Sequence, residues 1–71
     1  MKRFTSKIAL ITAAKKIFRS PKISDYGSSV WIFQNYDLVG HFDDFDNTGA
    51  LAFTKIESSN LAYSLGMYRE Q

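Results

Sequence analysis

The sequence has no cysteine, and this absence removes two common ways of stabilising a chain of 71 residues. Without thiols there is no disulfide framework, and zinc sites built from thiolates are excluded as well. Small secreted domains usually need such disulfides or metal sites for stability. We therefore expect a cytoplasmic protein whose stability comes from its hydrophobic core. Formation of a homo-oligomer is a further source of stability that the sequence leaves open.

Histidine is also scarce, and His41 is the single histidine in the chain. A general base needs a nucleophile within hydrogen-bond reach and usually a third group that orients it. No cysteine is present, and no serine or threonine stands at a spacing that predicts such contact. We expect His41 to be an ordinary strand residue in a non-enzymatic protein with no catalytic residues and no cofactor.

Long hydrophobic runs are also missing, since the apolar stretch 8–14 falls well short of the ~20 residues of a membrane span. We therefore expect no membrane span. Residues 1–22 are basic and free of acid, which partly resembles a targeting segment. Lys7, Lys15 and Lys16 interrupt or directly follow the apolar stretch, so a helix of the folded domain is the favoured interpretation, and targeting stays the alternative.

Aromatic residues are abundant, with six Phe, four Tyr and one Trp in a chain that is 45% hydrophobic. An aromatic side chain buries about 150–250 Å², so these residues are enough for one small core. A chain of this length forms one domain at most and depends on most of its apolar residues reaching the core. The sequence therefore predicts a single domain over residues 1–71.

The charge is divided between two parts of the chain. Residues 1–22 carry seven basic side chains and no acidic one, whereas residues 23–71 carry seven acidic and two basic ones. These charges of +7 and −5 leave the modest total of +2. Such an asymmetry bears on the choice of binding partners rather than on the fold.

Apolar spacing predicts a helix over residues 5–19, with Thr5 or Ser6 as its cap and Pro21 following its end. Ile8, Ile11, Ala14 or Lys15, and Phe18 recur at helical spacing and are expected on its buried side, with Leu10 and Ile17 on the flank. Residues 22–29 are expected to form a connector.

Strands are predicted at 30–33, 38–43 and 50–57, separated by turns at 35–37 and 44–49. A further turn is predicted at 58–60. Residues 61–68 fit either a strand or a helix, and their alternation favours a strand. The expected fold is α+β, with one N-terminal helix packed on a three- to four-stranded antiparallel meander sheet in two layers.

The segment 44–49 begins like a calcium-binding loop, because Asp44, Asp46 and Thr48 occupy the first alternate ligand positions. The position that needs a bidentate glutamate is Lys55, and a strand rather than a helix is expected to enter the loop. We expect a turn and no metal site.

The residues that remain favour recognition of another protein. The expected protein-binding residues are Trp31, Tyr36, Asp43, Asp44 and Asp46, because aromatic side chains anchor interfaces and charged ones select partners. A short, cysteine-free domain with divided charge is similar in type to the small inhibitors of phages and mobile elements. This likeness implies an acidic hairpin that docks on a host protein that handles nucleic acid.

The alternative is a nucleic-acid-binding module that uses the basic N-terminal helix. Its candidate residues are Lys15, Lys16, Arg19 and Lys22, whose charges would neutralise phosphates. Trp31, Phe33 and Tyr36 could form a platform for base stacking on the outer face of the sheet, as in single-strand binders. The acidic residues 43–46 argue against this alternative, because an acidic hairpin near a stacking face repels a phosphate backbone.

Overall fold

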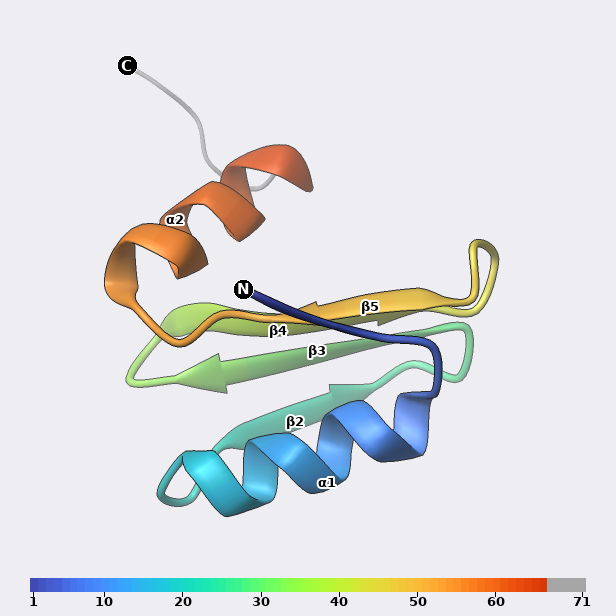
Figure 1. The fold of residues 1–71 in the computed structure, drawn as a ribbon, viewed down its shortest axis with the longest axis horizontal. Helices are drawn as coiled ribbons and strands as arrows, with labels where there is room; N and C mark the ends of the chain where they lie inside the picture. The colour runs from blue at the N-terminus through green and yellow to red at the C-terminus, as the bar shows by residue number, and fades with distance from the viewer. Residues whose placement is uncertain (67–71) are drawn as a thin grey trace.

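The computed structural model describes residues 1–66 as a five-stranded antiparallel sheet with a helix on each face (Figure 1). The strands lie side by side in the order β1-β5-β4-β3-β2. In chain order the elements are β1 (Lys2–Phe4), α1 (Lys7–Ile17), β2 (Lys22–Asp25), β3 (Ser29–Gln34), β4 (Asp37–Asp43), β5 (Thr48–Leu51) and α2 (Lys55–Ser64). The predicted α+β class and the antiparallel meander are confirmed.

The number of strands and layers differs from the expectation. Two edge strands were missed: β1 at one edge and β2, which lies within the predicted connector 22–29, at the other. Both are short and polar, so neither shows the apolar alternation by which a strand is predicted. Because α2 covers the face of the sheet opposite to α1, the domain has three layers instead of two.

The C-terminal part of the prediction was wrong in a specific way. The third predicted strand ends at Leu51, and the segment from Lys55 to Ser64 is helical, including the predicted turn 58–60. A capping box begins this helix: the Glu57 N–H donates to the Thr54 hydroxyl (3.1 Å), and the Thr54 N–H donates to the Glu57 carboxylate (3.2 Å). Residues 67 and 68, the last of the ambiguous segment 61–68, lie outside the described residues.

Helix α1 is confirmed within shorter bounds, and its predicted buried side is confirmed in part. The Ala9 N–H donates to the hydroxyl of Ser6, the predicted cap, at 3.4 Å. Leu10 and Ala14, one turn apart, are fully buried, whereas Ile8 is 74% exposed. Ile11 and Phe18 are partly buried against the core, so Ile8 is the apolar residue of the predicted stripe that faces outward, and Leu10, expected on the flank, takes the central position.

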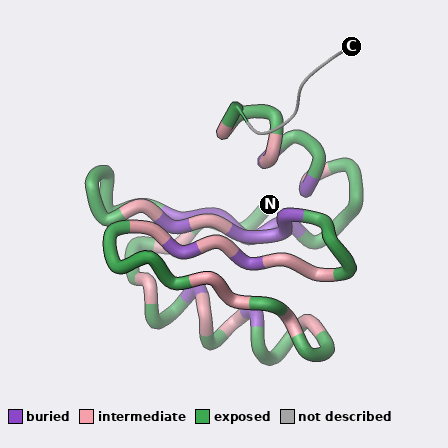
Figure 2. Tube along the Cα trace, turned by 180° about the vertical axis from the view of Figure 1, so that it is seen from behind, coloured by how far each residue is buried: buried purple, intermediate pink, exposed green. Residues whose placement is uncertain are grey.

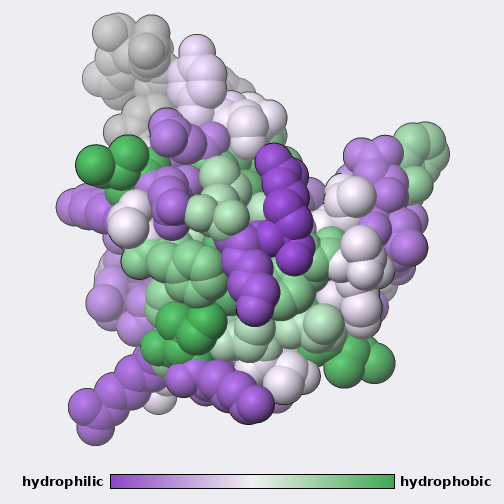
Figure 3. All heavy atoms as spheres, in the orientation of Figure 1, coloured by the Kyte–Doolittle hydropathy of each residue, from purple (hydrophilic) through white to green (hydrophobic). Residues whose placement is uncertain are grey.

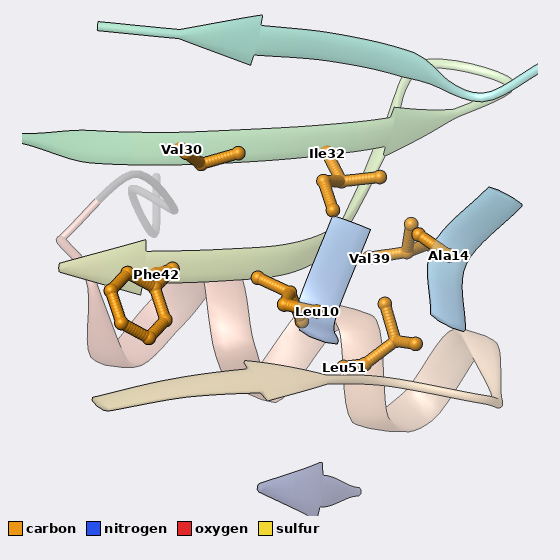
Figure 4. Packing of buried hydrophobic residues seen from close by; sticks show 7 residues of the cluster. All are labelled: Leu10, Ala14, Val30, Ile32, Val39, Phe42 and Leu51. Atoms are coloured by element: carbon orange, nitrogen blue, oxygen red, sulfur yellow. The ribbon is translucent and has the colours of Figure 1, made fainter. Parts of the chain in front are cut away.

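The main core lies between α1 and one face of the sheet. Side chains from β3, β4 and β5 point toward the helix, and α2 lies behind the strands (Figure 4). The buried residues are Leu10, Ala14, Val30, Ile32, Val39, Phe42 and Leu51. A β-bulge between β3 and β4 puts two consecutive residues, Val39 and Gly40, against the single position of Ile32.

A smaller cluster holds α2 on the other face. The helix packs along β4, where Leu61 contacts Leu38 and Ala50, with Trp31 and Phe33 half-buried beside them. Seen from this side, α2 lies to one side of the sheet and leaves β2 and the outer part of β3 uncovered by other described elements (Figure 2). Neither helix of residues 1–66 has the length and apolar character needed to cross a membrane.

Gly49 provides a test of how closely the strands pack on the core. A Cβ atom at this position would lie 2.6 Å from Cδ2 of Phe42 and 2.9 Å from the carbonyl oxygen of His41. We expect Gly49→Ala to lower the free energy of unfolding by about 1–3 kcal/mol, because neither neighbour can move freely. Urea unfolding measures the loss. Exposed Thr48 is the matched control, and a cost for Gly49→Ala no larger than that for Thr48→Ala would contradict this packing.

Candidate functional site

The antiparallel meander places the connections at two opposite ends of the sheet. Asp43 pairs with Ser29 at one end, where the β2–β3 and β4–β5 turns meet. Phe33 pairs with both Lys22 and Leu38 near the other end, next to the β3–β4 turn (Figure 1). The six residue steps along β4 separate the two ends by about 20 Å. Side chains in the turns therefore form two distinct surfaces.

The first surface, called here the acidic end, consists of residues 43–46 and the neighbouring Tyr26. Phe45 is 93% exposed at the hairpin tip between two aspartates, and Tyr26 is also exposed. The Phe45 N–H donates to the Asp43 carboxylate (2.9 Å), and the Asp44 N–H donates to the Ser28 carbonyl (2.8 Å). These bonds fix the tip and tie the two turns together. In Figure 3 the tip projects from the body as an apolar patch among hydrophilic atoms.

Asp43, Asp44 and Asp46 form no ion pair within residues 1–66. The ion pairs found there join Lys7 to Asp25 (3.4 Å) and the N-terminal ammonium to Glu57 (2.6 Å). Two cations lie near the three aspartates, because Arg3 lines a cleft with Asp43 and Asp46, and Lys7 donates to the Gly27 carbonyl (3.2 Å) in the adjoining β2–β3 turn. Asp44 and Asp46 are solvent-exposed and remain available to a cation from another molecule. The acidic end therefore combines exposed carboxylates that are not ion-paired with exposed aromatic rings.

His41 lines a cleft of about 190 Å³ beside the acidic end, together with Arg3, Asp43, Asp46 and Ser64. Burial lowers the pKa of His41, and the nearby carboxylate of Asp43 partly opposes this shift. The Ser64 hydroxyl donates to the Leu61 carbonyl (2.9 Å), and no nucleophile within residues 1–66 forms a hydrogen bond with His41. The cleft thus gives no support to a catalytic role.

A second surface, called here the basic end, surrounds the β3–β4 turn. A hollow of about 540 Å³ is lined there by Lys22, Phe33 and Tyr36, with Ser20 and Asn35 completing it. Arg19 precedes Ser20 in the chain. Lys55, at the start of α2, lies near the same turn because it shares a small cavity with Asn35. The basic end therefore combines cations with two aromatic rings.

The predicted basic residues do not form one patch. Lys22 lies in the hollow and Arg19 is next to it in sequence, but Lys16 lines a separate groove on the α1 side with Lys2. Lys15 is exposed in the last turn of α1. Lys55 was missed because it lies outside the basic N-terminal part of the chain.

The predicted protein-binding residues are likewise separated. Asp43, Asp44 and Asp46 lie together, whereas Tyr36 is fully exposed at the opposite end of the sheet. Trp31 is half-buried between them, edge-on to His41 with ring centroids 5.6 Å apart.

Sequence reasoning missed Phe45 as a site residue. Its position inside an acidic turn, where polar residues are the rule, was the available signal.

Within residues 1–66 no group of three metal-ligating side chains is found. Comparison with protein-family models, curated proteins and solved structures finds no match, so the geometry alone supports the functional argument.

Tyr36 occupies a backbone conformation that tyrosine disfavours. Asn35 and Tyr36 both have positive φ, 51° and 70°, as a two-residue type I′ turn requires. Glycine is the preferred second residue of such turns. We expect Tyr36→Gly to raise the free energy of unfolding by about 0.5–1 kcal/mol, since relief of strain exceeds the entropic cost of glycine. Thermal unfolding measures the gain, and Tyr36→Ala, which keeps a Cβ, should not show it. A loss of stability on Tyr36→Gly would contradict the strain.

The lowered pKa of His41 makes stability depend on pH. His41 binds its proton more tightly in the unfolded chain than in the folded one. Its contribution to the free energy of unfolding is therefore complete above about pH 6.5 and is lost as the pH falls below that value. The pKa values of Asp25 and Glu57 are lowered too, so these carboxylates stay ionised in this range. NMR titration of the single imidazole should give a pKa below 6.5. In His41→Asn the free energy of unfolding should change less between pH 7.5 and 5 than it does in the wild type. A His41 pKa above 6.5 in the folded protein would contradict the lowered pKa.

Proposed function

We propose that this chain is a non-catalytic protein-binding module that docks on its partner through the acidic end. The observation that carries the proposal is the exposure of Phe45 at a fixed hairpin tip between Asp44 and Asp46. Aromatic residues are the usual anchors of protein interfaces, and surrounding carboxylates add selectivity and faster association.

The rigidity of the tip supports this proposal. An anchor that is already held in place loses little conformational entropy on binding. The hydrogen bonds from Phe45 to Asp43 and from Asp44 to Ser28 hold the hairpin before any partner arrives. An aromatic ring that is 93% exposed adds little to folding, so its placement at the tip favours a role in binding.

The partner that fits this surface is a protein with a basic face around an apolar pocket. Nucleic-acid-handling proteins present such basic faces to phosphates. Carboxylates of the acidic end would compete with phosphate for the same cations, as an inhibitor of the phage or mobile-element type does. The proposed function is therefore inhibition of a host protein of this class by occupation of its nucleic-acid surface.

Affinity capture from the source cells tests this proposal. We expect the wild-type chain to retain a specific protein that is lost with Phe45→Ser and with Asp44→Lys combined with Asp46→Lys. The charge-reversed variant loses both attraction and selectivity, because like charges now face the partner. Addition of single-stranded or duplex nucleic acid should release the captured protein.

Tyr36→Gly is the matched control, since it removes an equally exposed ring from the opposite hairpin turn. This variant should retain the same protein as the wild type. Equal capture by wild type, Phe45→Ser and the double charge reversal would refute docking through the acidic end. Circular dichroism and thermal unfolding of each variant establish that a loss of capture is not a loss of fold.

A further inference from the structure

We propose that the basic end is a separate binding site for single-stranded nucleic acid, with Tyr36 and Phe33 as stacking faces. The inference concerns the end of the sheet that the proposed protein-binding function leaves unused. It is carried by the shape of this surface, the strain at Tyr36 and the charges around it.

The shape is that of a trough around two aromatic rings. The hollow of about 540 Å³ with Lys22 and a second one of about 210 Å³ both have Phe33 and Tyr36 in their lining. The second hollow reaches Ser58 and Ser59 on α2. The combined volume of the two hollows falls within the range of small-ligand sites, about 300–1,000 Å³. This volume is enough for one or two nucleotides. Phe33 is half-buried and forms the floor, whereas Tyr36 stands free at the rim.

The conformation of Tyr36 indicates that its ring serves binding. The residue has φ of 70°, and its side chain is fully exposed, so it gains no packing in return for the strain. Residues in sparsely populated backbone conformations cluster at active sites, ligand clamps and switch regions. A free aromatic face beside a half-buried one is the arrangement on which unstacked bases lie.

The charges at this end suit a phosphate backbone. Lys22 lines the trough, Arg19 precedes it in the chain, and Lys55 lies near the same turn. Asp37 also lies here and partly offsets these cations. The acidic end lies about 20 Å from Tyr36 along β4, and this distance exceeds the electrostatic screening length of about 8 Å at physiological salt. Repulsion between its carboxylates and a strand bound at Tyr36 is therefore weak.

Stacking on the two rings requires bases that are free of a duplex, and this selects single strands. Duplex nucleic acid can meet the cations but cannot insert bases into the trough. The site therefore favours a short single-stranded segment, read through backbone charge and stacking and with little preference for base sequence.

Fluorescence anisotropy with a labelled mixed-sequence single-stranded 12-mer, as DNA and as RNA, tests the proposal at 50 mM salt. We expect saturable binding that weakens at least about fivefold with Tyr36→Gly, the loss typical of one stacked base. Lys22→Gln should weaken binding and lower the salt slope by about 0.7, the value for one phosphate contact. Fluorescence of Trp31, whose ring lies 6.5 Å from that of Phe33, should change on binding.

Phe45→Ser is the control, and it should bind the 12-mer as the wild type does, so this test and that of the acidic end can fail independently. No single-strand binding at 50 mM salt would overturn the proposal. So would equal affinity of wild type and Tyr36→Gly, or equal binding of single strand and duplex, because both results would indicate simple charge attraction. Tyr36→Gly is expected to be more stable than the wild type, so its loss of binding would not reflect unfolding.

Discussion

The packing of α1 against one face of the sheet is the interaction on which the rest of this structure depends. Fully buried Leu10 and Ala14 meet side chains from β3, β4 and β5, and this contact fixes the strand register. A shift of one residue would move Val30, Ile32 and their neighbours to the opposite face. With the register fixed, each turn is held at a defined end of the sheet, and so are the residues that the turns carry.

The two ends then differ in charge and in the way they hold an aromatic residue. At the acidic end hydrogen bonds through Asp43 and Asp44 support Phe45, whereas at the basic end Tyr36 occupies a strained turn above a trough. The division is not complete, because Arg3 lines the cleft near Asp43. The two surfaces are nevertheless far enough apart for each to act on its own partner.

The fold class could be predicted from the sequence because its central elements carry strong local signals. Ser6 and Pro21 frame α1, and Val30 to Phe33 are β-branched and aromatic, so both elements were found. The edge strands could not be predicted, since their pairing with neighbours far along the chain outweighs their weak local preference. Helix α2 was missed because the capping box of Thr54 and Glu57 was not recognised: residues 50–57 were assigned to a strand, and the apolar alternation after residue 60 favoured another one. Residues of both candidate surfaces were named from the sequence, but their grouping was not, because no spacing in the sequence shows that Lys22 and Tyr36 are neighbours.

Amide chemical shifts of the ¹⁵N-labelled chain, recorded while a single-stranded 12-mer is added, test most directly whether the two ends act separately. The account predicts that the largest changes occur at residues 20–22 and 33–36, with residues 43–47 unchanged. Changes at residues 43–47, or changes spread along α1 with none at the β3–β4 turn, would contradict it.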